Sequence, residues 1–280
     1  MLSFPSALKC MLNAMKSPEY SESPLRKCLR KLLVIGSSMP PALVEELRST
    51  FQLEELRSCY GMSEIGGYLT VPPRGDVSGL DVGFPVSGTR MKVIDPVSGS
   101  VLGPMERGEV LFDTPYRTSG YIGNSEATAA FVDDRGWVHT GDLGYYNQDG
   151  RLFLCGRLKV VLNCLSRNVY PVEVEQHLLE HPAVEQVAVL GVSSPEFGEA
   201  PAAMVVLTHG YSPDERLAEE LKEFVAGRLP VYKHLYGGVY FADQLPTNSL
   251  GKVIRSQLPH LLGSLRRMDC AKHSIKECEF

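Results

Sequence analysis

A short apolar run at 32–36, with the sequence LLVIG, sets the strongest limit on how this chain can fold. Its length and its final glycine are typical of a buried strand. A turn of small residues, Gly36 to Pro40, follows, and Pro41 begins a predicted helix over 41–51, because proline is tolerated in the first turn of a helix. Strand, small-residue turn and helix form the unit with which α/β folds present ligand sites at strand ends. An ordinary connection fits this stretch equally well. Helices are also expected over 5–16 and 24–31.

The next predicted strand, Leu56 to Cys59, ends in the run Tyr60-Gly61-Met62-Ser63-Glu64. An aromatic ring, a flexible glycine, a hydroxyl and a carboxylate therefore leave one strand tip together. The ring could stack on a base, the hydroxyl could bond a phosphate, and the carboxylate could hold Mg²⁺, a cation that takes oxygen ligands. The same spacing also suits a plain loop with a helix cap.

From 70 to 155, short strands alternate with turns rich in Gly, Pro and Asp, and one helix is expected over 124–131. This pattern indicates a small β-rich subdomain. Within it, Asp142 and Arg157 bracket a predicted strand hairpin. A carboxylate accepts from two adjacent sugar hydroxyls, and a guanidinium offers a rigid fork of donors to a ribose or a phosphate. The two residues therefore predict half of a nucleotide clamp.

Beyond Arg157, helices and strands alternate over the remaining residues, which indicates a compact α+β domain. We place the domain boundary at 157–159, because a hinge needs only one or two residues. Near the end, the polar loop 245–252 holds Lys252 after a glycine and before a predicted helix over 251–264. Such a loop suits a mobile cation, although stretches of this kind more often carry an ordinary surface lysine.

The charge balance and the cysteines limit the partners and the compartment. The net charge is −5 and the pI is about 5.8, so no attraction to nucleic acid or to an anionic membrane is expected. Seven scattered cysteines without a C-x-x-C pair indicate a reduced, intracellular protein, cytoplasmic or peroxisomal. No apolar run approaches the roughly 18 residues of a membrane span. The C-terminal Glu-Phe carries no peroxisomal address of the Ser-Lys-Leu type. The oligomeric state is not indicated.

Several motifs occur in order along the chain. They are Tyr-Gly-Met-Ser-Glu at 60–64, Gly-Trp-Val-His-Thr-Gly-Asp at 136–142, Gly-Arg-Leu-Lys at 156–159, Asn-Val-Tyr-Pro-Val-Glu-Val-Glu at 168–175 and Gly-Lys at 251–252. Together, over about residues 1–260, they resemble the adenylate-forming (AMP-binding) superfamily of acyl-CoA synthetases, coumarate–CoA ligases and insect luciferases. The resemblance implies an α/β plus α+β fold. Residues 1–157 would form the C-terminal part of a large AMP-binding domain, with an α/β portion and a β-rich subdomain. Residues 158–280 would form a small mobile C-terminal domain.

The resemblance also implies a ligase reaction in two steps. ATP and a small carboxylic acid, here a fatty acid, give an acyl-adenylate and pyrophosphate, while Lys252 bridges carboxylate and phosphate oxygens as charge develops. The small domain then rotates about the hinge residue Lys159, and the thiolate of coenzyme A attacks to give the thioester. ATP, Mg²⁺ and CoA are therefore the expected cofactors and co-substrates. Light emission is not implied.

The remaining roles that the resemblance implies fall on the larger domain. Gly36 and Ser37 would lie near the acyl group and the adenine. Tyr60 would stack on the adenine, and Gly61 beside it would belong to the same nucleotide site. Ser63 would bond the α-phosphate, which makes it a catalytic candidate together with Lys252 and with Glu64, the expected Mg²⁺ ligand. Asp142 would hold the ribose hydroxyls with help from Arg157.

One departure from the family concerns its phosphate loop. The family grips phosphates with a Ser/Thr/Gly-rich stretch that ends in Pro-Lys-Gly, well upstream of the Gly36 region, and these residues contain no counterpart; Tyr116 to Gly120 has the wrong composition and place. We therefore predict an N-terminally truncated relative that does not form acyl-adenylate at the family's rates. We also predict poor stability, because a sheet that begins partway leaves strand edges uncovered.

Smaller departures follow the hinge. Cys164-Leu165-Ser166 stands where the family has a glycine-bearing run, Asn163 stands where luciferases and coumarate ligases have a second lysine, and Leu250 replaces a Ser or Thr. A competing zinc pattern, H-x-x-E-H over 177–181, is disfavoured because its second histidine ends the helix before a proline.

Overall fold

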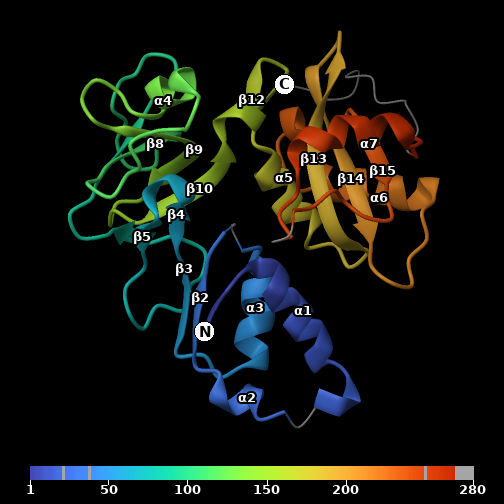
Figure 1. Cartoon of the computed structure of the whole chain (residues 1–280). Coiled ribbons are helices and arrows are strands. Elements are labelled where there is room, and N and C mark those ends of the chain that lie inside the picture. Colours follow the sequence, from blue (N-terminus) through green and yellow to red (C-terminus); the bar gives the residue numbers. More distant parts are fainter. Residues whose placement is uncertain (21–22, 37–38, 249–250, 269–280) are drawn as a thin grey trace. The chain divides into compact units, whose positions relative to one another are not determined.

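Figure 1 shows the computed structural model of the chain, which describes residues 1–20, 23–36, 39–248 and 251–268. The chain divides into two compact units, Met1–Lys159 and Val160–Phe280. Ser37 and Leu250 lie outside the described residues. A search of the described part of the chain finds no helix with the length and apolar content that a membrane crossing needs.

The first unit begins with a parallel sheet of the order β1-β2-β3. Two helices pack on it through one apolar core, to which Leu8, Leu32 and Leu47 contribute fully buried side chains. The predicted buried strand and the helix that begins with Pro41 are both confirmed. The elements are β1 (Leu2–Ser3), α1 (Pro5–Met15), η1 (Pro18–Tyr20), α2 (Leu25–Cys28), β2 (Lys31–Val34), α3 (Pro41–Thr50) and β3 (Glu55–Ser58).

The helix predicted over 24–31 is too long. It ends at Cys28, because Leu29 adopts an extended backbone with φ −79° and ψ 102°, and Lys31 already belongs to β2. The apolar spacing that suggests a helix continues into the buried strand, where Leu32 and Val34 face the two packed helices. Periodicity alone does not separate a short helix from the strand that follows it.

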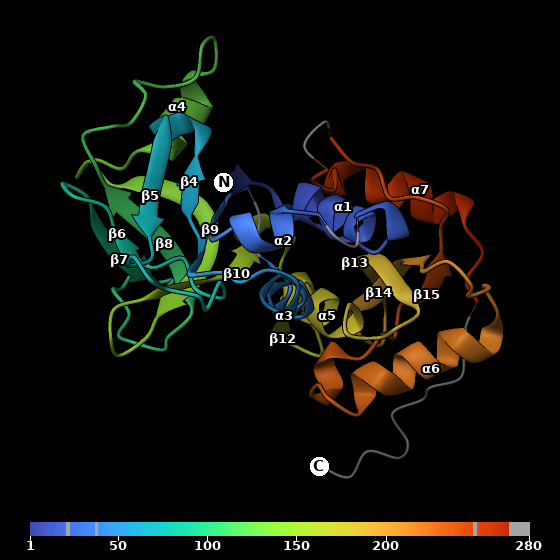
Figure 2. The same cartoon turned by 90° about the horizontal axis from the view of Figure 1, so that it is seen from below.

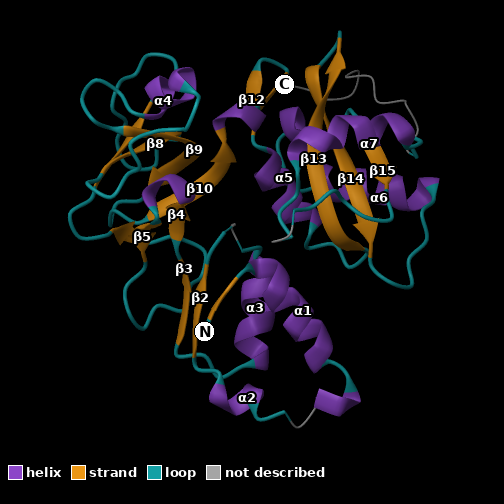
Figure 3. Cartoon of the chain, in the orientation of Figure 1, coloured by secondary structure: helices purple, strands orange, loops and turns teal. Residues whose placement is uncertain are grey.

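The rest of the first unit is β-rich, as Figure 3 shows, and it includes the short helix α4. One antiparallel sheet has the order β4-β5-β6, and a second has the order β10-β9-β8-β7. The predicted helix is capped by Asn124, whose side chain accepts from the Ala127 N–H at 2.9 Å. The elements are β4 (Tyr60–Met62), η2 (Ser63–Ile65), β5 (Gly67–Val71), β6 (Phe84–Pro85), β7 (Arg90–Ile94), β8 (Gly108–Asp113), α4 (Ser125–Phe131), β9 (Val138–Tyr146) and β10 (Leu152–Arg157).

The second unit is built on one five-stranded sheet in which β12, β11, β14 and β13 are neighbours and β15 pairs with β14 in parallel. The predicted helix over 251–264 begins later than expected, because Val253 pairs with Thr247 in a hairpin. The elements are η3 (Leu158–Val160), which crosses the boundary, β11 (Leu162–Cys164), β12 (Arg167–Val169), α5 (Pro171–Leu178), β13 (Val184–Ser194), β14 (Gly198–Leu207), α6 (Glu215–Ala226), η4 (Val231–Lys233), β15 (Gly238–Phe241), η5 (Arg255–Gln257) and α7 (Leu258–Ser264).

Both faces of this sheet are covered, and the side chains of β13 alternate between them. Val187 and Val189 join the core formed with α5 and α6, whereas Ala188 joins a second core with Leu258 of α7. Figure 2 shows α6 and α7 on opposite sides of the strands. Since successive strand residues point to opposite faces, this arrangement explains why residues 187–190 of β13 are all apolar.

Candidate functional site

The tip of β4 and the middle of β9 meet through a short hydrogen bond. The Tyr60 hydroxyl donates to Asp142 Oδ2 at 2.5 Å, and the two residues are only 8% and 7% exposed. Burial, followed by the neighbouring Asp142 carboxylate, raises the pKa of Tyr60 well above its usual value. The phenol therefore stays protonated and remains a donor. The Tyr60 ring packs against Phe112, with ring centroids 6.0 Å apart.

The second oxygen of Asp142 meets Arg157 across the hairpin that the sequence predicted. In the β9–β10 hairpin, Arg157 lies opposite Asp142, and its Nε is 2.7 Å from Asp142 Oδ1. The arginine side chain is 55% exposed, so its guanidinium reaches solvent while the carboxylate stays inside. Because the pair is half in water, its attraction is screened and it is better suited to orienting the carboxylate than to stabilising the fold. The arrangement leaves a charged, oriented pair beside a buried phenol.

The backbone of β9 is held in place before Asp142. Thr140 Oγ1 donates to the Val110 carbonyl at 2.7 Å and accepts from the Asp142 N–H at 3.0 Å. The buried carboxylate of Glu109 accepts from the Gly141 N–H at 3.1 Å. Gly141 has φ +65°, a left-handed backbone that glycine adopts at low cost. These contacts fix the direction in which Asp142 leaves the strand.

A second pair lies at the tip that carries Glu64. The Tyr121 hydroxyl donates to Glu64 Oε1 at 2.8 Å, and the Thr118 N–H donates to the Glu64 carbonyl at 2.7 Å. The hydrogen bond to Glu64 raises the pKa of Tyr121, whereas the charge of Arg157 lowers it. The charge of Arg157 also opposes the rise in the pKa of Tyr60, which burial causes. The charge of Arg157 therefore lies close to both pairs. The tyrosine of the second pair is not singled out by sequence reasoning, because it lies 57 residues from its partner.

The structure also places the other candidates of the first unit. Ser63 is exposed at the start of η2. Gly61 is required by packing, since a Cβ there would lie 2.2 Å from the Gly67 carbonyl oxygen. Gly36 follows β2 with φ +93°, and a Cβ there would lie 2.8 Å from the Phe4 ring. Lys159 is exposed and is the last residue of the first unit.

Within the described residues, no group of three His, Cys, Asp or Glu side chains could hold a metal ion. The pattern over 177–181 therefore gains no third ligand of this kind among the residues that the structure describes. Instead, His181 Nδ1 accepts from the Ala183 N–H at 3.2 Å, which makes it a packing residue. Glu64 supplies one carboxylate, so Mg²⁺ at that position would draw its other oxygens from nucleotide and water.

Lys252 belongs to the second unit and lies on an exposed hairpin. The Lys252 N–H donates to Asn248 Oδ1 at 2.9 Å, and the Asn248 N–H donates to the Lys252 carbonyl at 2.9 Å. These two hydrogen bonds hold the Lys252 backbone against Asn248, while the lysine side chain is exposed to solvent.

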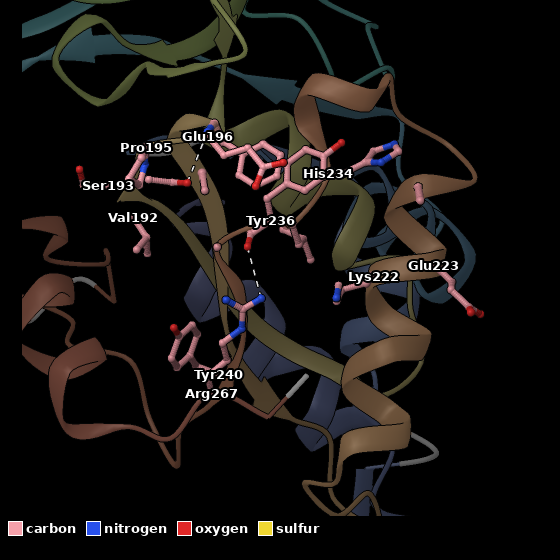
Figure 4. Close-up of a pocket in the computed structure, with 16 residues that line it drawn as sticks. Val192, Ser193, Pro195, Glu196, Lys222, Glu223, His234, Tyr236, Tyr240 and Arg267 are labelled. Carbon is pink, nitrogen blue, oxygen red and sulfur yellow. Dashed lines mark hydrogen bonds between the residues drawn. The ribbon is translucent and has the colours of Figure 1, made fainter. Parts of the chain in front are cut away.

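A pocket of about 330 Å³ opens in the second unit between the β13–β14 turn, α6 and the segment before β15. Figure 4 shows Lys222 reaching from α6 toward the side on which Arg267 lies. The Arg267 Nη2 donates to the Tyr236 carbonyl at 3.3 Å, and the Tyr236 ring stacks on Phe197 with centroids 4.1 Å apart. Glu196 and Glu223 also line the pocket, as does His234. Sequence reasoning missed this pocket, because its walls come from distant segments.

The hairpin that replaces the family's glycine-bearing run is strained. Cys164 pairs with Arg167, so Leu165 and Ser166 form a two-residue turn, and their φ values are +52° and +59°. Such turns favour glycine or asparagine, because both residues need a left-handed backbone. Asn163 lies opposite Asn168 in this hairpin, and its N–H donates to a carboxylate oxygen of Glu199 at 2.9 Å.

We expect Ser166→Gly to stabilise the second unit by about 1 kcal/mol, since a left-handed backbone costs a non-glycine residue roughly that much. Ser166 is exposed, so no packing is lost. A thermal melt should show a midpoint higher by roughly 4 °C. Ser166→Ala keeps the strain and should melt close to wild type, and a glycine variant that melts no higher than the alanine variant would contradict the expectation.

Comparison with known proteins identifies the family to which the chain is similar. The model of the AMP-binding enzyme family matches residues 1–122, and that of the AMP-binding enzyme C-terminal domain matches residues 173–252. A 4-coumarate–CoA ligase 1 of Glycine max is 33% identical over 248 residues, which cover 87% of this chain and 83% of that sequence. The chain belongs to the AMP-binding enzyme family. A luciferin 4-monooxygenase of Photinus pyralis is 35% identical over 227 residues, which cover 81% of this chain and 41% of that protein.

Solved structures of this AMP-binding family have the same fold. ATP-bound MatB of Rhodopseudomonas palustris matches with a TM-score of 0.81 and 27% identity, over 93% of this chain and 50% of its own. An o-succinylbenzoate CoA synthetase of Bacillus subtilis, solved with its acyl-adenylate intermediate, matches with a TM-score of 0.76 and 29% identity over 92% and 50%. The mixed α/β architecture expected from the sequence is therefore confirmed as that of adenylate-forming enzymes. The chain spans about half the length of these structures.

Proposed function

We propose that this chain carries the ribose-binding and lysine-bearing parts of an ATP-dependent ligase that activates a carboxylic acid. The observation that carries the proposal is the cluster in which Asp142 meets both Tyr60 and Arg157, at 2.5 and 2.7 Å. A buried, oriented carboxylate with two acceptor oxygens matches the two hydroxyls of a ribose. The family to which the chain belongs supports a nucleotide as the ligand.

In this proposal, the carboxylate of the acid attacks the α-phosphorus of ATP and pyrophosphate leaves. Asp142 and Arg157 hold the ribose, and Tyr60 holds Asp142 and offers its ring to the adenine. Ser63 donates to the α-phosphate, and Glu64, oriented by Tyr121, would ligate Mg²⁺. Gly36 and Gly61 would keep the backbone close to the nucleotide without a side chain, and Ser37, which lies outside the described residues, keeps the role near the acyl group and the adenine that the family resemblance implies.

Lys252 acts on the charge that develops in the transfer. Its ammonium would bridge the acid and phosphate oxygens, which is the electrostatic contribution that phosphoryl-type transfers need most. Its exposed position on a fixed hairpin suits a group that engages only when the two units are suitably arranged, with Lys159 as the pivot.

The acceptor that we propose is coenzyme A, whose thiolate attacks the acyl carbon and releases AMP. The pocket of the second unit supports this choice, because Arg267 supplies a guanidinium and Tyr236 an aromatic ring, features that suit a phosphorylated nucleotide, whereas Lys222 pairs with Glu219 at 3.4 Å. Arg267→Gln should therefore raise the KM for CoA in thioester formation without changing the first step. An unchanged KM would remove the pocket from the proposal.

The acid is proposed to be a fatty acid, although the solved relatives carry names of other acids, such as o-succinylbenzoate. A second candidate function is nucleotide binding without turnover at the family's rates. The observation in its favour is that the 280 residues contain no Ser/Thr/Gly-rich run ending in Pro-Lys-Gly. Both candidates share the nucleotide site of the first unit.

The deciding experiment measures ATP–pyrophosphate exchange by this chain with a series of fatty and aryl acids, followed by CoA addition. Exchange that depends on a fatty acid, and thioester formation once CoA is present, would support the ligase. Binding of ATP by calorimetry without any acid-dependent exchange would favour the second candidate. Absence of ATP binding would contradict both.

A further inference from the structure

A partly buried ion pair joins α5 to the segment that follows Lys252. Arg255 Nη2 lies 2.6 and 2.8 Å from the two carboxylate oxygens of Glu175, so one guanidinium nitrogen spans the carboxylate. The side chains of Arg255 and Glu175 are 28% and 12% exposed. A guanidinium holds its donors in a rigid planar fork, so its other nitrogen can bind a second acceptor in a fixed direction, which the flexible ammonium of a lysine does not do.

The same two side chains hold β13 between them. Glu175 Oε1 accepts from the Val189 N–H at 2.7 Å, and Arg255 Nη1 donates to the Val189 carbonyl at 2.9 Å. Three segments, α5, β13 and the start of η5, are therefore tied at one residue. Arg255 is not needed for the hydrophobic layer of α7, which packs through Leu258. The specific effect of the pair is to fix where the chain enters η5.

That entry point lies directly after the lysine hairpin. Thr247 pairs with Val253, and the Ile254 N–H donates to the Pro246 carbonyl at 2.8 Å, so the hairpin closes one residue before Arg255. A rigid base of this kind limits the positions that the Lys252 ammonium can reach. An ammonium that stabilises a transition state needs a fixed position, because electrostatic catalysis depends on prior orientation and a misplacement of about 1 Å can cost about 10²-fold in rate.

We propose that Glu175 and Arg255 are positioning residues, which clamp the base of the hairpin and thereby hold Lys252 in one place. The proposal rests on the proposed function of Lys252 and deepens it. Neither residue touches the reacting atoms, and both act through the hairpin. The pair spans 80 positions of sequence, so only the fold reveals it.

Trypsin reports on the clamp without any activity assay. Cleavage after Lys252 requires the hairpin to open locally. Cleavage after the exposed Arg228, which lies just beyond α6, serves as the internal reference. Mass spectrometry of the fragments gives the ratio of the two cuts. We expect Arg255→Gln to raise this ratio about tenfold or more, because the glutamine leaves the buried Glu175 carboxylate unpaired. Arg255→Lys, which keeps the charge but not the fork, should raise it less.

The matched control removes another ion pair from the same helix. Glu173 lies two positions before Glu175 and pairs with Lys233 at 2.7 Å, away from the hairpin. Lys233→Gln should lower the melting temperature but leave the ratio of the cuts unchanged, whereas a merely structural role of Arg255 would raise both cuts together. Lys252→Ala removes the fragment and thus verifies the site of cleavage.

The exchange assay completes the test. Arg255→Gln should lower the maximal rate of acid-dependent exchange and leave the KM for ATP within about twofold, since the nucleotide site is elsewhere. An unchanged ratio of cuts would overturn the clamp, whatever the exchange shows. If Arg255→Gln raises the ratio of the cuts but wild type shows no exchange, the proposed function is overturned. The control of the hairpin by the clamp would still stand in that case.

Discussion

Lys252→Ala is expected to lower acid-dependent ATP–pyrophosphate exchange by about 10²–10³-fold, the usual loss when one donor to developing charge is removed. Binding of ATP should stay close to wild type, because the proposed ribose-binding residues Asp142 and Arg157 belong to the first unit. The side chain is exposed, so its removal leaves the fold intact. The measurement is the exchange rate at saturating ATP and acid, with calorimetry for the affinity.

Two control variants sharpen this prediction. Lys252→Arg keeps the positive charge and should retain part of the activity, although its planar fork does not superimpose on an ammonium. Lys27→Ala removes another exposed lysine, in the first unit, and should behave as wild type. If Lys252→Ala exchanged pyrophosphate at the wild-type rate, the electrostatic role of this lysine would be excluded.

The sequence predicts those parts of the site that local structure brings together. Asp142 and Arg157 lie at opposed positions of one hairpin, so their distance of 2.7 Å follows once β9 and β10 are recognised. The strand at 32–36 and the helix after Pro41 are predictable for the same reason, since apolar periodicity and proline placement are local signals. Their boundaries are less predictable, as the helix expected over 24–31 demonstrates.

Contacts between segments that lie far apart along the chain cannot be predicted from one sequence. Tyr121 is a tyrosine in a glycine-containing turn, and only the tertiary fold brings it to Glu64. The Glu175–Arg255 pair spans 80 positions and carries no periodic signal. Glu109 accepts from the Gly141 N–H from the neighbouring strand, and no sequence pattern predicts this contact either. The sequence thus predicts pairs within one hairpin, such as Asp142 and Arg157, whereas it does not predict the distant residues that hold such pairs in place.

Asp142→Asn is expected to weaken ATP binding by about 2 kcal/mol, or roughly 30-fold, because loss of a buried charged partner typically costs at least this much. The amide keeps the shape of the carboxylate and still accepts from Tyr60, but it no longer attracts Arg157 and it accepts through one oxygen instead of two. Tyr60→Phe removes only the orienting donor and should cost about 1 kcal/mol. Calorimetric titration of each variant with ATP checks both values.

The matched control is Asp113→Asn, which breaks the ion pair with Arg90 across β7 and β8 of the same sheet. It should leave ATP binding unchanged, so that a loss in Asp142→Asn cannot be attributed to a weakened sheet. Thermal melts of both variants compare their folding directly.

The decisive comparison uses the sugar itself. If Asp142 holds the two ribose hydroxyls, wild type should bind ATP about tenfold more tightly than 2′-deoxy-ATP, because one charge-assisted hydrogen bond is lost. In Asp142→Asn this discrimination should fall to about twofold or less, since the partner of the missing hydroxyl is already impaired. Discrimination that persists unchanged in Asp142→Asn would assign the ribose to other residues, while leaving the exchange chemistry of Lys252 untouched. The test applies both to an active ligase and to a chain that binds nucleotide without turnover, because it measures only the binding of nucleotide that we propose for the first unit.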